Sequence, residues 1–488
     1  MNQAQTDAAQ TLEQCGMHID GKWLDDAERG RITVTRKWDG ADVALIPVAN
    51  DEDIRAAGDA AQRAFENVDL SPQQRYALLM EIAAVVEADR EELTRLLVSD
   101  VGKTHKESVA EVGSAVQALI DAAEEAKRLV GEVIPVQAMS GSENRIAFTL
   151  FTPVGPVLAI TPFNAPLNQA AHKVAAAIAA GNTVVVKPNP LTSLVTAHFV
   201  RLIVDRTSCP AGVVGLLYGE GEVGAALVAD TRYQHISFTG SAAVGRSIRA
   251  AIGLRGVTLE LGSNAPVIVH EDANLDLAAD ACVRSGYAIA GQVCTSVQRI
   301  LVHRDVAEEF ARRLVQRAQQ LKVGDPSDPE TDVGPMISLA GAERAERWMS
   351  QAMSRGAKLR LGGARDGRHF EPTILDHVTD DMDIVCQELF APIMNLLRYD
   401  DLDEAFRRAN DSQYGLQAGI FTASVGTAML AAKRLRYGGV MVNDASRYRA
   451  ANMPYGGVKD SGLGREGARY AIRGQCDMKT LVLLSEDS

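Results

Sequence analysis

The chain of 488 residues contains few cysteines, and they lie far apart. Its six cysteines are Cys15, Cys209, Cys282, Cys294, Cys386 and Cys476, and no two of them form a C-x-x-C pair. This spacing excludes the common zinc-ribbon and thioredoxin-like motifs, and it is not typical of a secreted disulfide framework. We therefore expect reduced thiols, no metal site and a cytoplasmic location.

Long apolar runs and an excess of positive charge are also missing. No segment approaches the roughly 18 apolar residues that a membrane-spanning helix needs. Residues 1–16 are polar, with neither a basic start nor an apolar stretch, so we expect no signal peptide. The 63 acidic residues outnumber the 50 lysines and arginines, which leaves a net charge of −13. We therefore expect neither nucleic acid nor a membrane as a partner.

Aromatic residues make up only 5% of the chain, whereas small and aliphatic residues are abundant. Apolar residues recur at helical spacing over 51–68, 71–102 and 106–131, and Ser71 with Pro72 is a good helix start. From residue 181 to 262, short apolar strands alternate with helices. This alternation predicts a doubly wound α/β sheet, which typically binds a nucleotide at its carboxyl edge. A second α/β region begins near Asn264.

One glycine-rich loop matches a dinucleotide-binding pattern. Residues 219–224 read "GEGEVG", which fits G-x-G-x-x-G between a strand and a helix. Glu220 and Glu222 lie inside this loop, where their charge would oppose a phosphate. We therefore favour a plain strand-to-helix turn, with a phosphate cradle as the alternative.

A second glycine turn is a better phosphate candidate. Residues 238–245 read "FTGSAAVG", with Gly240 in the turn and Ser241 at the expected helix N-cap. The N-terminus of the helix that follows could receive a phosphate. An ordinary capped helix fits the same residues equally well.

Four residues with chemical potential follow one another along the chain. They are Asn164 in "PFNAP", Lys187 in "VVVKP", Glu260 in "LELGSNAP" and Cys294 in "GQVCTS". A carboxylate within an apolar strand is unusual, because burying a charge is costly without a partner or a task. Each residue also has a structural interpretation: a capping Asn, a snorkelling Lys, an ion-paired Glu and a core Cys.

Together with "QELFAPI" and "NDASRYRAANMPYGGVKDSGLGREG", these motifs resemble the NAD(P)-dependent aldehyde dehydrogenase superfamily over nearly the whole chain. The C-terminal motif is similar to the branch of lactaldehyde, succinate-semialdehyde, sulfolactaldehyde and phosphonoacetaldehyde dehydrogenases. The resemblance implies oxidation of a small aldehyde, anionic or hydroxylated, to the carboxylic acid. The reaction would pass through a thiohemiacetal and a thioester on a cysteine.

The resemblance also implies an organisation of the chain within the α/β aldehyde dehydrogenase fold. Residues 1–131 and 153–261 would form a Rossmann-like cofactor-binding domain, and residues 262–465 an α/β catalytic domain. Residues 132–152 and 466–488 would form a small β oligomerisation element. A homodimer or homotetramer is expected, with these strands pairing across subunits to hide an exposed edge.

By the same resemblance, Cys294 is the nucleophile and Glu260 the base that activates water for thioester hydrolysis. The side-chain amide of Asn164 and the backbone N–H of Cys294 would hold the oxyanion. The resemblance places the cofactor, NAD or NADP, against Ile160, Thr161, Pro162, Phe163, Lys187, Pro190, Gly221, Phe238, Thr239, Gly240, Ser241, Leu261, Glu388 and Phe390.

Some of these positions imply particular contacts. Lys187 is similar to the residue that binds the adenosine ribose, Ser241 to the pyrophosphate contact and Glu388 to the carboxylate that binds the nicotinamide ribose. Relatives that prefer NAD usually carry Glu three residues after the lysine, where this chain has Pro190. Proline neither chelates the ribose nor repels a 2′-phosphate. We therefore expect NADP to be accepted at least as well as NAD.

The substrate contacts are expected in the loop of the C-terminal motif and around the thiol. Arg447 and Arg449 could form forked hydrogen bonds to a carboxylate, sulfonate or phosphonate, and structural or subunit contacts are the alternative. Val293 and Thr295 would line the pocket.

Three other functions remain possible at this point. One is a coenzyme A-acylating dehydrogenase, which Glu260 disfavours, and another is a non-oxidative cysteine thioesterase, which would not need Lys187 or Glu388. The third is a catalytically idle relative, which would have no reason to keep Asn164, Glu260 and Cys294 together.

Overall fold

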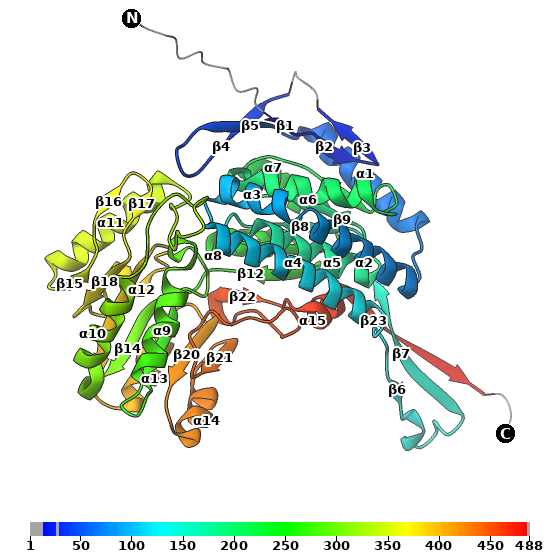
Figure 1. The fold of residues 1–488 in the computed structure, drawn as a ribbon. Coiled ribbons are helices and arrows are strands. Elements are labelled where there is room, and N and C mark those ends of the chain that lie inside the picture. Colours follow the sequence, from blue (N-terminus) through cyan, green and yellow to red (C-terminus); the bar gives the residue numbers. More distant parts are fainter. Residues whose placement is uncertain (1–12, 26–28, 486–488) are drawn as a thin grey trace, which may run out of the picture.

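The computed structural model describes residues 13–25 and 29–485 of the chain (Figure 1). Residues 1–12, at the start of the expected cofactor-binding domain, and residues 486–488, at the end of the expected oligomerisation element, lie outside the described residues. Most strands belong to an eight-stranded and a seven-stranded sheet, and each of these sheets has its own buried apolar core.

The eight-stranded sheet has a parallel centre. Its order is β22 (Gly462–Leu463), β12 (Gly256–Glu260), β11 (His235–Thr239), β8 (Val157–Ile160), β9 (Val184–Lys187), β10 (Val214–Leu216), β2 (Met17–Ile19) and β3 (Lys22–Leu24). The strands from β12 to β10 pair in parallel, and their residues are nearly all buried because helices cover both faces. The register sets Ile160 beside Lys187 and Thr239 beside Glu260, so four expected site residues lie at one sheet edge.

In the described part of the chain, nine helices pack around this sheet. They are α1 (Asp51–Asn67), α2 (Pro72–Ala88), α3 (Arg90–Val101), α4 (His105–Ala126), α5 (Pro166–Ala180), α6 (Ser193–Arg206), α7 (Gly221–Ala229), α8 (Ala242–Ala251) and α15 (Ala468–Gly474). The expected start at Ser71 is confirmed, because its side chain caps α2 and Pro72 occupies the first turn. The single helix expected over 71–102 is wrong, since Asp89 separates α2 from α3 with φ −102° and ψ 18°.

The seven-stranded sheet forms the other large body, at the left of Figure 1. Its order is β15 (Lys358–Leu361), β18 (Thr373–Asp376), β19 (Ile393–Tyr399), β14 (Val297–His303), β13 (Ala265–Val269), β20 (Gln417–Phe421) and β21 (Gly439–Val442). Only β15 pairs antiparallel. The accompanying helices are α9 (Leu275–Gly286), α10 (Ala307–Ala318), α11 (Leu339–Ser354), α12 (Asp383–Cys386), α13 (Leu402–Asn410) and α14 (Val425–Arg434).

A three-stranded sheet projects from the body as an arm (Figure 1). It consists of β23 (Cys476–Leu484), β7 (Arg145–Pro153) and β6 (Val133–Ile134), with β7 in the middle. The strands expected to pair across subunits, β7 and β23, pair with each other within the chain. Eight of the nine residues of β23 are exposed, and its outer edge pairs with no other described strand.

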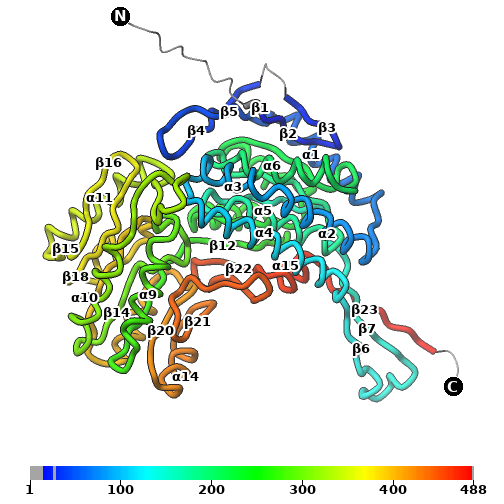
Figure 2. Tube along the Cα trace, viewed as in Figure 1, coloured from blue at the N-terminus to red at the C-terminus, as the bar shows by residue number. Residues whose placement is uncertain are grey.

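Smaller elements complete the description. One further sheet has the order β1 (Glu13–Gln14), β5 (Asp42–Pro47) and β4 (Arg31–Thr35), and β16 (Arg365–Asp366) pairs with β17 (His369–Phe370). The tube in Figure 2 shows the chain returning from the seven-stranded sheet through β22 to α15, beneath β12.

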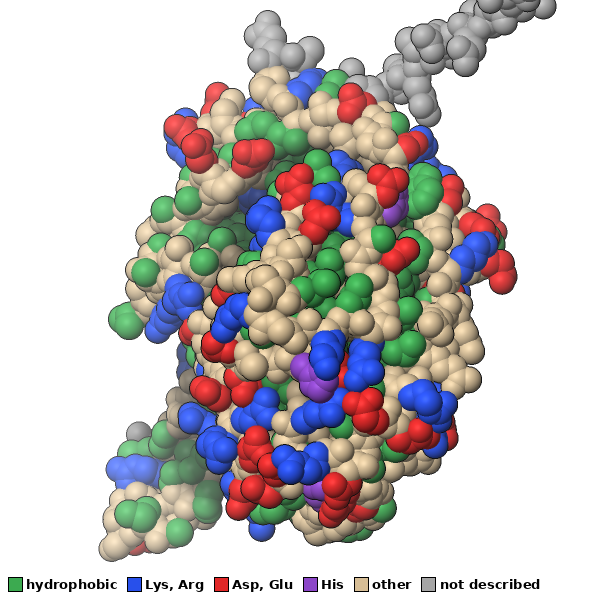
Figure 3. All heavy atoms as spheres, turned by 90° about the vertical axis from the view of Figure 1, so that its left-hand side faces the viewer, with side chains coloured by type: hydrophobic (Ala, Val, Ile, Leu, Met, Phe, Trp, Pro, Cys, Tyr) green, Lys and Arg blue, Asp and Glu red, His purple; other side chains and the backbone are tan. Residues whose placement is uncertain are grey.

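Two surface properties bear on possible partners. On the face drawn in Figure 3, acidic and basic side chains are interspersed over the surface. Within the described ranges, no helix is both long and apolar enough to cross a membrane.

Candidate active site

A cavity of about 1700 Å³ lies between the carboxyl edge of the eight-stranded sheet and the elements around the seven-stranded sheet. Both bodies contribute to its wall. The lining residues come from the ends of β8, β9, β11 and β12, from α4 and α11, and from the loop around residues 444–455. Typical sites for one drug-sized ligand measure roughly 300–1000 Å³, so this cavity has room for a dinucleotide and a small substrate together.

Cys294 follows a turn of unusual backbone conformation. The short helix η3 (Ala288–Gly291) contains Ile289 and Ala290, both with φ 51°, followed by Gly291 with φ 72°. A side chain at position 291 would place its Cβ 2.1 Å from the carbonyl oxygen of Ala391. The backbone N–H of Ile289 donates to a carboxylate oxygen of Glu107 on α4, at 2.7 Å. A strained turn, held from the other body, therefore leads to the thiol.

The thiol of Cys294 lines the cavity and has one hydrogen-bond partner among the described residues. Its Sγ lies 3.1 Å from the hydroxyl oxygen of Tyr455. Removal from bulk water raises the pKa of Cys294 to about 12, and the hydrogen bond with Tyr455 opposes this shift. The thiol is therefore protonated at neutral pH and needs activation before it can attack a carbon.

Asn164 is held beside this turn. Its Nδ2 donates to the backbone carbonyl oxygen of Gln292 at 2.8 Å, two residues before Cys294, and its side chain lines the cavity. An amide nitrogen carries two hydrogens, so one remains for a second acceptor. Asn164 can thus donate to an oxygen bound near the sulfur.

Glu260 ends β12 as a buried carboxylate. Its residue is 3% exposed, and neither side-chain oxygen has a hydrogen-bond partner among the described residues. Burial, and then the negative charge of Glu466, raise the pKa of Glu260 well above its usual value. Burial alone would also raise the pKa of Glu466, but the charges of Lys173 and Arg449 lower it. Two carboxyl groups with opposite pKa shifts are typical of an acid–base site.

The sequence pattern of the aldehyde dehydrogenase family matches residues 23–481. The chain belongs to the aldehyde dehydrogenase family. The 3-sulfolactaldehyde dehydrogenase of Priestia aryabhattai is 44% identical over 473 residues, which cover 97% of this chain and 98% of that protein. The lactaldehyde dehydrogenase of Methanococcus aeolicus is 38% identical over 472 residues, which cover 96% of this chain and 99% of that protein.

A solved structure shows the same fold. It is the glyceraldehyde-3-phosphate dehydrogenase of Methanocaldococcus jannaschii complexed with NADP, with 39% identity and a TM-score of 0.89, over 94% of this chain and all of that one. The resemblance and the α/β fold expected from the sequence are therefore confirmed. This aldehyde dehydrogenase is an oxidoreductase that acts on an aldehyde group with NAD(P).

The expected cofactor residues of this aldehyde dehydrogenase converge on the cavity, with one exception. The lining includes Ile160, Thr161, Pro162, Phe163, Lys187, Pro190, Phe238, Thr239, Gly240, Ser241, Leu261, Glu388 and Phe390. Gly221 is not among the lining residues. Gly221 begins α7, and a Cβ there would meet no atom within 4 Å, so its expected contact with the cofactor stays a prediction.

Several buried polar groups of the lining lack full partners. Among the residues that the structure describes, the ammonium of Lys187 has a single hydrogen bond, 3.4 Å to the carbonyl of Pro188, and burial lowers the pKa of Lys187 to about 8. The hydroxyl of Thr161 is buried and has no hydrogen-bond partner within the described ranges. Ser241 caps α8, whose N-terminus opens into the cavity. These groups fit a ligand rich in hydroxyl and phosphate groups, as a nicotinamide dinucleotide is.

Glu388 is another carboxylate of the cavity lining. Glu388 accepts the backbone N–H of Ser263 at 2.8 Å, and burial raises the pKa of Glu388 to about 7. The rings of Phe163 and Phe390 meet edge to face, with centroids 5.8 Å apart. This region combines a hydrogen-bond acceptor with an apolar wall, which suits a ribose beside a flat ring.

The two arginines expected to bind substrate have different surroundings. Arg449 donates to Glu466 at 3.0 Å, and its guanidinium lies 4.0 Å from the ring centroid of Tyr455. Arg447 is half-buried in the lining and contacts no acidic group among the described residues. Val293 and Thr295 line the cavity beside the thiol. Arg447 is therefore available to an anion, whereas Arg449 is already ion-paired.

Sequence reasoning missed three of these neighbours. Tyr455 lies in "NMPYGG" and Glu466 in "GREG", inside a motif already quoted for the resemblance. A phenol and a carboxylate within that motif could have been recognised as candidate site residues. Their partners Cys294 and Lys173 lie far away in the sequence, so the contacts themselves could not be predicted. Glu107 offered no signal beyond a helix-capping position, which it also occupies.

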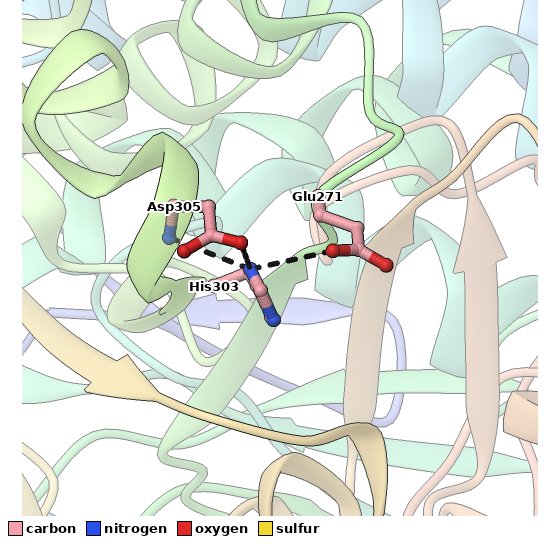
Figure 4. A group of neighbouring side chains, drawn as sticks. All are labelled: Glu271, His303 and Asp305. Carbon is pink, nitrogen blue, oxygen red and sulfur yellow. Dashed lines mark hydrogen bonds and ion pairs between the residues drawn. The ribbon is translucent and has the colours of Figure 1, made fainter.

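Another group of ionisable side chains lies away from the cavity, and Figure 4 shows it. The Nδ1 of His303 lies 3.8 Å from a carboxylate oxygen of Glu271 and 3.8 Å from one of Asp305. Both ring nitrogens also contact the backbone, at the carbonyl of Asp400 and the N–H of Asp305, and both carboxylates are exposed. These contacts explain the group without a ligand, and the expectation of no metal site stays a prediction.

Proposed function

We propose that this aldehyde dehydrogenase oxidises a short anionic 2-hydroxyaldehyde, of the 3-sulfolactaldehyde type, to the carboxylate. The observation that carries this proposal is Arg447, a cation in the wall of the cavity that also contains Cys294, with no acidic partner in the part of the chain that the structure describes. A guanidinium in this position can bind a sulfonate through two hydrogen bonds. Relatives named for 3-sulfolactaldehyde and lactaldehyde support a three-carbon hydroxyaldehyde.

The chemistry starts at Cys294. Its thiolate attacks the aldehyde carbon, and the oxygen that becomes negative accepts hydrogen bonds from Asn164 Nδ2 and from the backbone N–H of Cys294. The nicotinamide supplies a hydride acceptor when it is bound. Glu260 then removes a proton from the water that attacks the thioester on Cys294, and the thiolate leaves as the acid forms.

The same residues disfavour the alternative products. A carboxylate at Glu260, unpaired and buried, supports hydrolysis rather than transfer of the acyl group to coenzyme A. A cysteine thioesterase would have no use for Lys187, Ser241 and Glu388. We propose that these three hold the adenosine ribose, the pyrophosphate and the nicotinamide ribose, in that order.

We also propose the division of the chain that the resemblance implies. The two separate apolar cores support a cofactor-binding domain of residues 1–131 and 153–261 and a catalytic domain of residues 262–465. The projecting arm of β6, β7 and β23 supports the oligomerisation element implied for residues 132–152 and 466–488, in a homodimer or homotetramer. Residues 466–474 are the exception, because Glu466 lies in the candidate active site and α15 contributes to the core of the eight-stranded sheet. The exposed apolar residues of β23 would be covered in such an assembly.

The test of the proposed substrate is a panel of aldehydes assayed with NAD and NADP. It contains 3-sulfolactaldehyde, lactaldehyde, succinate semialdehyde, phosphonoacetaldehyde and benzaldehyde. We expect the highest kcat/KM with 3-sulfolactaldehyde. A higher value with a neutral aldehyde would contradict the proposal.

Arg447→Met is expected to separate the charged substrate from its neutral analogue. Loss of a charged hydrogen-bond donor should raise KM for 3-sulfolactaldehyde by about ten- to a hundredfold, whereas KM for lactaldehyde should change by less than about threefold. The control is Arg284→Met, because Arg284 lines the same cavity but contacts Asp444 at 3.4 Å. Equal effects of Arg447→Met on both aldehydes would remove Arg447 from the substrate site.

Pro190→Glu is expected to shift the cofactor preference toward NAD. Pro190 lines the cavity beside Lys187 and carries no charge. A carboxylate there should repel a 2′-phosphate and lower kcat/KM with NADP by at least about tenfold, with a smaller change for NAD. Pro190→Gln controls for the loss of proline. The interpretation of Pro190 fails if kcat/KM of the unaltered enzyme is about a hundredfold higher with NAD than with NADP. Without a carboxylate at position 190 to repel the 2′-phosphate, so strong a preference for NAD is not expected.

A further inference from the structure

The hydroxyl of Tyr455 points to the sulfur that the reaction uses. Its only hydrogen bond among the described residues is the 3.1 Å contact with Cys294 Sγ. The residue is 5% exposed, so water does not compete freely for this hydroxyl. A paired backbone holds it in place, since Tyr455 and Glu466 exchange N–H to carbonyl bonds of 3.0 and 2.7 Å.

The ring of Tyr455 is also held from its face. The guanidinium of Arg449 lies 4.0 Å from the ring centroid, which is within cation–π distance. Arg449 donates to Glu466, and Lys173 donates to the same carboxylate at 2.9 Å. Arg449, which is ion-paired with Glu466, therefore holds the ring of Tyr455 in place and so positions its hydroxyl.

The protonation states set the direction of the hydrogen bond. Burial raises the pKa of Tyr455 well above its usual value, so its proton stays on oxygen throughout the physiological range. A thiolate has no proton to donate, whereas a neutral phenol has one. Once Cys294 is ionised, Tyr455 must be the donor. Hydrogen bonds to a charged acceptor are the strong ones, and a sulfur removed from water gains most from such a bond.

We propose that Tyr455 is a catalytic residue whose hydroxyl donates the hydrogen bond that stabilises Cys294 as a thiolate, with Arg449 as the positioning residue for its ring. The thiol releases its proton to water, and Tyr455 keeps its own. This inference rests on one part of the proposed function, the assignment of Cys294 as the nucleophile, and does not depend on the proposed substrate.

The test is the pH dependence of alkylation of Cys294 by iodoacetamide in the full-length enzyme, read by mass spectrometry of the peptide. In Tyr455→Phe the ring and its contact with Arg449 remain, and only the hydroxyl is lost. Because the thiol is mostly protonated at neutral pH, the alkylation rate there follows the small thiolate fraction, and we expect this rate to fall by about ten- to a hundredfold, which corresponds to a rise of about one to two pH units in the midpoint. The control is Tyr448→Phe, because Tyr448 lies in the same loop and is 56% exposed. An unchanged midpoint in Tyr455→Phe would overturn the proposal.

A second variant tests the same bond in the opposite direction. Replacement of Tyr455 by 3-fluorotyrosine strengthens the donor, so the midpoint should fall below that of the unaltered enzyme. A midpoint that stays or rises would count against the proposal.

The role of Arg449 has its own readout. Arg449→Met should raise the midpoint in both backgrounds, because the positive charge of Arg449 itself lowers the pKa of Cys294. The rise should be larger in the unaltered background than in the Tyr455→Phe background, because only the unaltered enzyme also loses the positioning of the hydroxyl. Equal rises in both backgrounds would mean that the guanidinium acts on the sulfur through its charge alone. Alkylation requires neither aldehyde nor NAD(P). The proposed substrate can therefore be wrong while the role of Tyr455 holds, and the role of Tyr455 can be wrong while the proposed substrate holds.

Discussion

Cys294→Ala is expected to lower kcat for aldehyde oxidation by at least about ten-thousandfold with either cofactor. The thiol is the only described nucleophile that lies beside an oxygen-binding amide, Asn164, and an unpaired buried carboxylate, Glu260. Without it, no thiohemiacetal forms, so hydride transfer has no tetrahedral donor. The measurement is the absorbance of NAD(P)H at steady state and in a single turnover.

The matched control for this substitution is Cys209→Ala. Burial raises the pKa of the Cys209 thiol to about 12, as at Cys294, but Cys209 does not line the cavity. We expect its kcat to stay within about twofold of the unaltered enzyme. Comparable losses in both variants would mean that a cysteine is needed for folding rather than for chemistry, and would refute the assignment of Cys294.

Glu260→Gln is expected to lower steady-state kcat by about a hundred- to ten-thousandfold while leaving a stoichiometric burst of NAD(P)H. The amide fills the same space at the end of β12 but cannot take a proton from water. Acylation of Cys294 should therefore proceed and hydrolysis should stop. Stopped-flow absorbance separates the two phases, and mass spectrometry of the intact protein detects the acyl adduct.

Two further measurements sharpen the Glu260 prediction. Hydroxylamine attacks a thioester without a general base, so it should restore turnover in Glu260→Gln but not in Cys294→Ala. The base must be ionised, and burial with Glu466 raises its pKa. Hydrolysis in the unaltered enzyme should therefore slow as the pH falls through this raised pKa, and the variant should lose that dependence. A variant without a burst would place Glu260 before hydride transfer instead.

Local patterns were sufficient to predict much of the fold. The strands from residue 181 to 262 are short and apolar and alternate with helices, one of which, α8, begins at the capping Ser241, so their order could be predicted. The break at Asp89 could not, because no glycine or proline marks it. Asp89 leaves the helical path where its carboxylate contacts His198 and Arg206 of α6, and these residues lie more than a hundred positions away in sequence.

The site shows the same division between local and distant information. Cys294, Glu260 and Asn164 stand in motifs that could be recognised, and all three line one cavity. The pairing of Arg449 with Glu466 could not be predicted, because residues of an irregular loop have no fixed period that tells which way they face. The adjacent Arg447 has the same charge and almost the same place in the sequence, yet only the structure separates the two.

The turn before the nucleophile has a consequence for recombining this enzyme with its relatives. The backbone of Ile289, at a left-handed φ of 51°, is tied to Glu107 of α4, and these residues belong to opposite bodies of the molecule. A chimaera that joins the first half of one parent to the second half of another takes residue 107 from the first parent and the turn at residue 289 from the second. Crossover points in such a chimaera would therefore have to preserve a carboxylate at position 107, or the turn before Cys294 would lose its hydrogen bond to α4.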